Sequence, residues 1–152
     1  MAPVRILIAD DHALMRQGLR QLCEQIGGFT VVADVASGAG SVDLARTLLP
    51  DVILMDLTMP DVDGVEAMRR IIQENPAARV VALTMYRHEQ YLLDAVRAGA
   101  RAYLLKTVDA GEMIAAILAV GRGDYLIDPA IAARAFSATY KAAAVWSRAA
   151  RM

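Results

Sequence analysis

Short, uninterrupted hydrophobic runs alternate with longer segments of helical periodicity along most of the chain. The runs predict five buried strands, at residues 4–9, 30–36, 52–55, 79–84 and 101–105. Segments in which apolar residues recur every three or four positions predict five helices, at residues 12–26, 42–49, 62–74, 89–98 and 109–120. Glycine or proline follows most of the helical segments, as at helix ends generally. The pattern therefore predicts five strand–helix units in succession.

The predicted strands differ from those of a half-exposed sheet. The first, third and fourth runs are apolar on both faces. Such runs are typical of parallel strands that helices cover on both sides. We therefore expect an α/β fold with three layers, in which a doubly wound parallel sheet lies between two layers of helices.

Composition narrows the class of protein. The chain has 152 residues, of which 57% are hydrophobic and 22% charged, with a net charge of −1. This balance predicts a sizeable core and no general attraction to nucleic acid or membrane. Cys23 is the single cysteine, which excludes a disulfide framework and favours a reducing compartment. With no apolar run of membrane-spanning length and no signal-peptide core, we expect a cytoplasmic protein that does not contact membrane.

Polar residues follow four of the five predicted strands. Asp10 and Asp11 end the first strand, Asp56 the third, Thr84 the fourth and Lys106 the fifth. In open α/β sheets, ligands bind at the carboxyl edge of the strands. We therefore expect three carboxylates, one hydroxyl and one ammonium group to gather at that edge.

This set of side chains indicates phosphoryl transfer. Crowded carboxylates repel one another unless a cation joins them, and Mg²⁺ prefers oxygen ligands and often binds a phosphate together with one or two carboxylates. Lys106 offers a charge for a phosphoryl oxygen, and Thr84 offers a hydroxyl donor. Asp56 is the candidate nucleophile, because the strand end exposes it while Gly64 helps to bend the chain away.

Four motifs reinforce this interpretation: "IADDH" (8–12), "PDVILMDLTMPDVDG" (50–64), "ALT" (82–84) and "AYLLKT" (102–107). In this order the chain resembles a response-regulator receiver domain of two-component signalling, most closely the NarL/FixJ-type branch. The resemblance covers residues 4–121. It implies a flavodoxin-like (βα)5 fold, a doubly wound parallel five-stranded sheet with the strand order 2-1-3-4-5. Members of this branch usually carry a C-terminal helix-turn-helix domain and regulate transcription.

The resemblance also implies roles for individual residues. Asp56 would accept a phosphoryl group from a phosphohistidine of a sensor histidine kinase. Asp11 would bind Mg²⁺ directly and Asp10 partly through water, with Asp56 and the backbone carbonyl of Thr58 as further ligands. Lys106 would contact the phosphoryl group. Such a protein is no enzyme beyond the autocatalytic transfer and dephosphorylation at its own aspartate.

The resemblance implies that further residues transmit the effect of phosphorylation and set the rate of dephosphorylation. Thr84 would move toward the phosphoryl group, and Tyr103 would follow as the aromatic part of the switch that changes the output surface. Thr58 and Tyr86 flank the site and would tune dephosphorylation. Phosphorylation would also favour a homodimer.

The residue after the lysine departs from the pattern of the resemblance. Many receivers have a proline there, often with a cis bond, whereas this chain has Thr107. A cis bond before a non-proline residue costs about 2.5–4 kcal/mol. We therefore expect the Lys106–Thr107 bond to be trans.

Other interpretations stay open. A phosphatase of the haloacid-dehalogenase kind also uses an aspartate and Mg²⁺, but its nucleophile lies on the first strand in a D-x-D pattern. A stand-alone receiver acting only through protein–protein contacts is a third reading. Asp10 and Asp11 could also serve the start of the following helix. His12 has no second histidine or cysteine nearby, so we expect no transition-metal site.

Residues 122–152 form a separate segment after the receiver-like residues 1–121. Asp128 and Pro129 predict a helix start, and the segment is rich in alanine. One face of the predicted helix is basic, with Arg134, Lys141 and Arg148. The opposite face is aromatic or small, with Phe136, Tyr140, Ala143 and Trp146. We expect a linker helix or a helix that docks on the receiver. Because the helix-turn-helix domain is absent from this chain, we expect no sequence-specific DNA binding by it.

Overall fold

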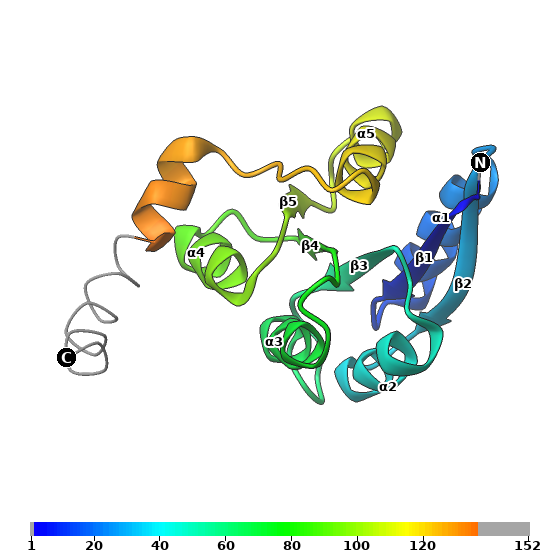
Figure 1. Cartoon of the computed structure of the whole chain (residues 1–152), viewed down its shortest axis with the longest axis horizontal. Coiled ribbons are helices and arrows are strands. Elements are labelled where there is room, and N and C mark those ends of the chain that lie inside the picture. Colours follow the sequence, from blue (N-terminus) through cyan, green and yellow to red (C-terminus); the bar gives the residue numbers. More distant parts are fainter. Residues whose placement is uncertain (1, 137–152) are drawn as a thin grey trace.

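Five parallel strands form one sheet in the order β2-β1-β3-β4-β5 (Figure 1). The computed structural model describes residues 2–136. The strands are β1 (Val4–Ala9), β2 (Phe29–Val35), β3 (Val52–Asp56), β4 (Val80–Thr84) and β5 (Ala102–Leu105). The helices are α1 (Ala13–Glu24), α2 (Gly38–Leu48), α3 (Gly64–Glu74), α4 (Glu89–Ala98) and α5 (Ala110–Gly121). The predicted class and strand order are confirmed. Within residues 2–136, no helix is long and apolar enough to cross a membrane.

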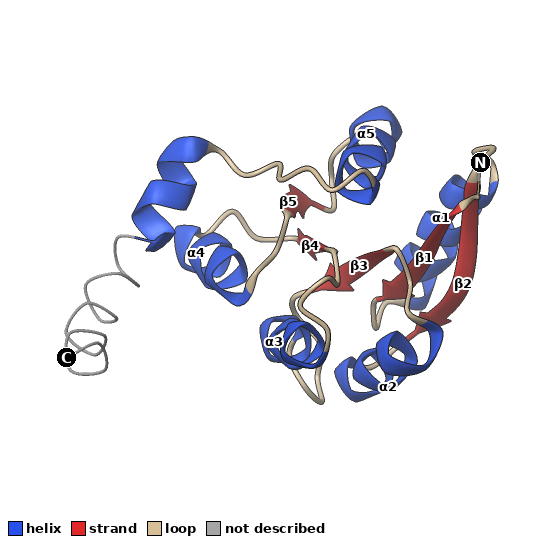
Figure 2. Cartoon of the chain, in the orientation of Figure 1, coloured by secondary structure: helices blue, strands red, loops and turns tan. Residues whose placement is uncertain are grey.

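Helices cover both faces of the sheet, which explains why the central strands are apolar throughout (Figure 2). Alternate residues of β1, β3 and β4, such as Leu7 and Ile53, pack with α2, α3 and α4 on one face. The residues between them, such as Ile8 and Leu54, pack with α1 and α5 on the other. The period of two along each strand thus divides the core into two halves that meet at the sheet.

The helix between β2 and β3 begins earlier than its apolar pattern predicts. We expected residues 42–49, whereas α2 starts at Gly38. Ser37 caps this start, since its hydroxyl accepts a hydrogen bond of 3.0 Å from the N–H of Gly40. The first turn contains two glycines, which add nothing to an apolar pattern. The capping serine is therefore the feature of the sequence that indicates this helix start. The other predicted boundaries differ by at most two residues.

A segment that follows α5 runs along the free edge of the sheet. Leu126 forms a parallel bridge with Ala102 of β5, and its N–H donates to the carbonyl of Arg101 at 2.6 Å. Residues 129–136 then form a helix beside α4 (Figure 1). Its predicted start is confirmed, because Asp128 Oδ1 accepts from the N–H of Ala130 at 2.8 Å. The other predicted helix residues, Tyr140, Lys141, Ala143, Trp146 and Arg148, lie outside the described residues.

This C-terminal segment contacts α4 through polar groups as well as by packing. Arg97 Nε donates to the carbonyl of Ala135 at 3.2 Å, and Arg134 forms an ion pair with Glu89. The Arg101 guanidinium lies 4.6 Å from the centre of the Tyr125 ring. The fold therefore holds residues 123–136 against α4 and β5.

Candidate functional site

Three carboxylates gather at the carboxyl edge of β1 and β3, as predicted. Asp10 and Asp11 follow β1, and Asp56 is the last residue of the adjacent β3. Oxygens of these three side chains and a ring nitrogen of His12 all lie within 4.8 Å of one another. Asp10 and Asp56 are buried, and Asp11 is half-buried. The parallel register of the two strands thus produces an acidic cluster that is largely buried from solvent.

Lys106 supplies the counter-charge of this cluster. Its Nζ lies 2.9 Å from Asp10 Oδ2 and 3.1 Å from Asp56 Oδ2. The lysine follows β5, where its N–H donates to the carbonyl of Thr84 at 2.8 Å and so extends the β4–β5 pairing. Burial by itself would lower the pKa of Lys106, but its contacts with Asp10 and Asp56 outweigh that effect and raise it. The ammonium group therefore stays charged. The structure describes no cis peptide bond within residues 2–136, so the Lys106–Thr107 bond is trans, as expected.

Asp56 is buried, so the expectation that its strand end exposes it was wrong: Lys106 and the N–H of Thr58 lie against its carboxylate. Burial raises its pKa to about 6, and the N–H of Thr58, 3.1 Å from Asp56 Oδ1, and the Lys106 ammonium oppose this rise. Gly64 packs over the same strand end, since a Cβ there would lie 2.1 Å from the Asp56 carbonyl oxygen. The loop after β3 can pass this close to Asp56 only because residue 64 has no side chain.

The loop after β3 is tied to the start of α2. Both carboxylate oxygens of Asp61 accept backbone N–H groups, from Gly38 and Ala39, each at 3.0 Å. The N–H groups of Ala39 and Gly38 lower the pKa of Asp61 to about 2. This anchor was not predicted, although an acidic residue facing a helix start is a recognisable pairing.

The donor set of the cluster suits a hard cation. Within residues 2–136, three of its buried oxygens have no well-aligned hydrogen-bond donor, namely Asp10 Oδ2, Asp11 Oδ1 and Asp56 Oδ2. Lys106 faces two of them at ion-pair distance, yet cannot satisfy every lone pair of three carboxylates. Buried carboxylate oxygens without donors are costly unless a cation binds them. These residues could therefore hold a metal ion.

His12 lies beside the acidic cluster. Its Nδ1 lies 3.4 Å from an oxygen of Asp10 and 3.4 Å from an oxygen of Asp11, and the side chain is exposed. The backbone N–H of His12 donates to Asp10 Oδ1 at 2.9 Å. The only sequence signal for this position is that the histidine follows the acid pair directly. A single imidazole beside three carboxylates still leaves a mainly oxygen-donor site.

Thr84, Tyr86 and Tyr103 form a second group next to the acidic cluster. The buried Thr84 accepts a hydrogen bond at its hydroxyl from the N–H of Tyr86, at 3.1 Å. The Tyr103 hydroxyl donates to the carbonyl of Tyr86, also at 3.1 Å. Burial raises the pKa of Tyr103, and the Thr84 hydroxyl opposes this rise. Both predicted switch residues are thus joined through one residue of the loop between β4 and α4.

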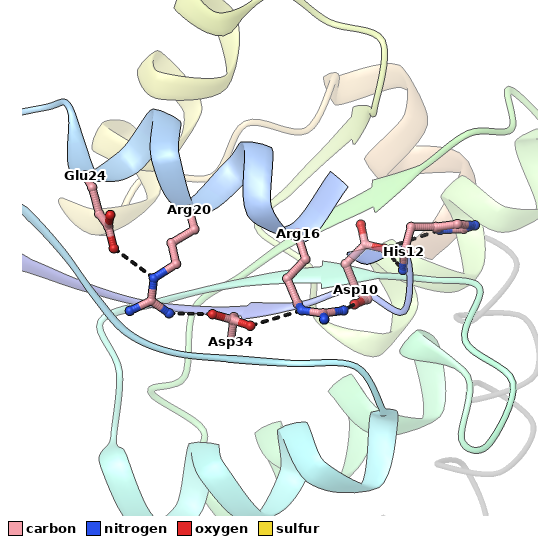
Figure 3. Close-up of polar contacts among 6 residues, drawn as sticks. All are labelled: Asp10, His12, Arg16, Arg20, Glu24 and Asp34. Carbon is pink, nitrogen blue, oxygen red and sulfur yellow. Dashed lines mark hydrogen bonds and ion pairs between the residues drawn. The ribbon is translucent and has the colours of Figure 1, made fainter. Parts of the chain in front are cut away.

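A network behind Asp10 was missed by the sequence analysis (Figure 3). Arg16 of α1 donates to the backbone carbonyl of Asp10 at 2.7 Å and to Asp34 of β2 at 3.0 Å. Arg20 contacts the other oxygen of Asp34 and also Glu24. The sequence indicates this network only weakly. Two arginines one helical turn apart can be recognised on α1, but no sequence pattern specifies that they meet an aspartate of β2.

Comparison with known proteins identifies the family to which this arrangement belongs. The family model of the response regulator receiver domain matches residues 6–118, which includes every residue of the acidic cluster and Lys106. The chain belongs to the response regulator receiver domain family. NarL and LuxR-family response regulators are among its relatives, which places this receiver domain in the NarL/FixJ-type branch and confirms the resemblance.

Individual relatives agree in sequence and in structure. The chain is 41% identical to the transcriptional regulatory protein DegU of Brevibacillus brevis, over 84% of this chain and 54% of that protein. A LuxR-family two-component response regulator from Aurantimonas sp. SI85-9A1 superimposes with a TM-score of 0.80 at 37% identity, over 91% of this chain and 99% of that one. The signal receiver domain of the NarL regulator of Mycobacterium tuberculosis gives 0.78 at 29%, over 81% and 99%. The chain spans about half the length of the curated relative.

Proposed function

We propose that this receiver domain accepts a phosphoryl group on Asp56 from the phosphohistidine of a sensor histidine kinase. The observation that carries the proposal is the contact of Lys106 Nζ with both Asp10 and Asp56 at the edge of the sheet. It places a fixed cation beside a carboxylate whose neighbours could hold a second cation. Two positive charges around one nucleophilic oxygen would stabilise the negative charge on the oxygens of a transferring phosphoryl group.

Mg²⁺ is the metal that we propose for the cluster. Asp11, Asp10 and Asp56 would hold it, together with the backbone carbonyl of Thr58, whose N–H already contacts Asp56. The all-oxygen donors among these residues favour a hard dication. When bound, Mg²⁺ would neutralise phosphoryl oxygens and lower the repulsion between the incoming phosphate and the carboxylates.

The proposed reaction is an in-line displacement. An oxygen of Asp56 attacks phosphorus, the P–N bond to the kinase histidine breaks, and the electron pair of that bond leaves with the imidazole, which takes up a proton. Lys106 contacts a phosphoryl oxygen throughout. Hydrolysis reverses the modification when water attacks the same phosphorus and releases inorganic phosphate. The protein would thus catalyse reactions only at its own aspartate.

The modification would alter the face formed by α4, β5 and the C-terminal segment. A phosphoryl group adds about −1.5 to −2 charges and three acceptor oxygens next to Thr84. If the Thr84 hydroxyl turns to an added oxygen, it gives up the N–H of Tyr86, and the Tyr103 contact with the same residue changes. We propose that Thr58 and Tyr86, at the rim of the site, tune dephosphorylation. The outcome is a population shift between two arrangements of that face.

The domain organisation that we propose is a receiver of residues 1–121 followed by a segment that docks on it. The polar contacts of Arg134 and Ala135 with α4 support docking for residues 122–136. In a full-length regulator, we propose that this face controls a homodimer and the transcription of target genes through a DNA-binding domain. The cytoplasm is the compartment in which such a phosphorelay would operate.

Labelling with a small phosphodonor tests the proposal. Incubation with acetyl phosphate and Mg²⁺ should add one phosphoryl group to the wild-type protein, as read by intact mass, and none to Asp56→Asn. A haloacid-dehalogenase-type phosphatase is the competing function, and p-nitrophenyl phosphate separates the two. We expect no sustained turnover of that ester. Continuous turnover that requires Asp10, the first residue after β1, would favour the phosphatase.

A further inference from the structure

We propose that Arg16 is a positioning residue, which fixes the metal-binding junction of β1 and α1 and is itself held by Asp34. The inference rests on the proposed function of the acidic cluster. Among the described contacts Arg16 binds no carboxylate of the cluster, and it acts on the cluster through its hydrogen bond to the main-chain carbonyl of Asp10 (Figure 3).

The main chain of Asp10 is held on both of its polar groups. Its N–H donates to the carbonyl of Val35 at 3.0 Å, which continues the β1–β2 pairing. Its carbonyl accepts from the Arg16 guanidinium at 2.7 Å. The chain leaves the sheet at this residue, so no further strand pairing fixes the next peptide. Arg16 therefore supplies the hydrogen bond that determines how the peptide between Asp10 and Asp11 is turned.

The orientation of that peptide sets where two ligand side chains point. Asp10 Oδ1 accepts the N–H of His12, and Asp10 Oδ2 faces Lys106. Asp11 is attached to the other end of the same peptide and is only half-buried. A rotation of the peptide would move the Asp11 carboxylate away from Asp10 and Asp56. Groups behind metal ligands commonly act in this way, by fixing the direction of the ligand.

Asp34 gives Arg16 its own fixed direction. One carboxylate oxygen of Asp34 accepts from Arg16 Nε at 3.0 Å, and the other contacts Arg20. The Arg16 side chain is 19% exposed, whereas that of Arg20 is 39% exposed and also contacts Glu24. Both arginines thus bind Asp34, but of the two only Arg16 has a hydrogen bond to Asp10 among the described contacts. Arg20 is therefore a matched control for the general stabilisation that the network gives to α1 and β2.

The test measures how the phosphorylation rate with acetyl phosphate depends on the Mg²⁺ concentration. For Arg16→Gln we expect the half-saturating Mg²⁺ concentration to rise about 10-fold. The rate at saturating Mg²⁺ should stay within about 2-fold of wild type, because Asp56 and Lys106 are untouched. Arg20→Gln should stay within about 2-fold of wild type in both quantities. Arg16→Lys, which can still donate to the carbonyl, should recover part of the shift.

A second variant covers the case in which Arg16→Gln folds poorly. Asp34→Asn keeps the Arg16 donor but weakens its anchor, so it should shift the half-saturating Mg²⁺ concentration in the same direction by a smaller factor. Equal effects of Arg16→Gln and Arg20→Gln, or a fall of the saturating rate without a shift in Mg²⁺ dependence, would overturn the proposal. Mg²⁺ titration followed by the amide shifts of residues 10–12 gives the same comparison without phosphorylation. It therefore separates a failure of this proposal from a failure of wild type to accept phosphate.

Discussion

The Lys106 ammonium lies 3.1 Å from the Asp56 carboxylate, and both side chains are about 2% exposed. The pair belongs to two strand ends that are not adjacent in the sheet, since β4 lies between β3 and β5. Lys106 therefore reaches across the edge of β4 to the acceptor. In the metal-free protein it acts as an internal counter-ion, and in the proposed reaction the same charge meets the phosphoryl group.

Replacement of Lys106 by methionine should make folding depend on metal. The change leaves the carboxylates of Asp10 and Asp56 buried without their ammonium partner, which costs about 3–5 kcal/mol for a buried pair. In the presence of a chelator, we expect urea denaturation to show a loss of this order. Saturating Mg²⁺ should restore a large part of the loss, because the cation replaces the missing charge. If Mg²⁺ stabilises Lys106→Met no more than wild type, the cluster is not the metal site.

The raised pKa of Asp56 predicts a pH-dependent stability. An unfolded aspartate ionises at its ordinary pKa, whereas burial raises the pKa of folded Asp56 to about 6. Between these values the folded protein holds a proton that the unfolded chain has lost, so stability falls as pH rises through this window. Above it, metal-free Asp56→Asn should be more stable than wild type by about 1–3 kcal/mol. The difference should shrink toward the acid end of the window.

The control for this experiment is Asp124→Asn, whose carboxylate is largely exposed. It should show no such pH-dependent gain. Urea denaturation at several pH values, with a chelator present, measures both variants against wild type. A less stable Asp56→Asn protein at neutral pH would show that Lys106 compensates Asp56 fully and that its ionised form carries no folding penalty.

Much of the fold could be predicted because its strands are buried on both faces. Continuous apolar runs such as that before Asp56 have no alternative placement in a protein of this size, and glycine and proline mark where the helices end. The gathering of Asp10, Asp56 and Lys106 follows from parallel topology alone, since it brings all carboxyl strand ends to one edge. These parts of the site needed no knowledge of side-chain geometry.

The remainder depends on contacts between residues far apart in sequence. The carboxylate of Asp61 accepts the N–H groups of Gly38 and Ala39 at the start of α2, and Arg16 of α1 binds Asp34 of β2. No periodicity specifies such pairs, because many surface carboxylates and guanidiniums could combine at equal cost. The early start of α2 was missed for a different reason, since it depends on local capping by Ser37 rather than on apolar residues.

Tyr103→Phe should loosen the loop between β4 and α4. The change removes the hydroxyl that donates to the carbonyl of Tyr86, a contact worth about 0.5–1.5 kcal/mol. Compared with wild type, we expect faster amide hydrogen exchange at residues 86–89 and unchanged exchange in the strands. Tyr125→Phe is the control, because its ring still stacks under Arg101 and the residue lies outside that loop. Unchanged exchange at residues 86–89 would remove Tyr103 from the coupling between site and face.

Arg101→Ala should release the C-terminal segment from the edge of the sheet. The change removes the hydrogen bond of 3.2 Å to the carbonyl of Gly123 and the stacking on Tyr125. Together these contribute on the order of 1–2 kcal/mol. Limited proteolysis should then cut residues 122–136 faster than in wild type, while Arg122→Ala, whose side chain is exposed, should not differ. Equal cleavage of all three proteins would favour a linker that does not depend on these contacts.

The site of modification is the central claim, and chemical mapping of the phosphorylated residue tests it most directly. Borohydride reduces an acyl phosphate to an alcohol, so the modified aspartate becomes homoserine and is recognised by peptide mass spectrometry. After labelling with acetyl phosphate and Mg²⁺, we predict homoserine at residue 56 and nowhere else, and none when Mg²⁺ is removed by a chelator. Homoserine at residue 10 or 11, or a phosphorylated protein without any homoserine, would contradict the account.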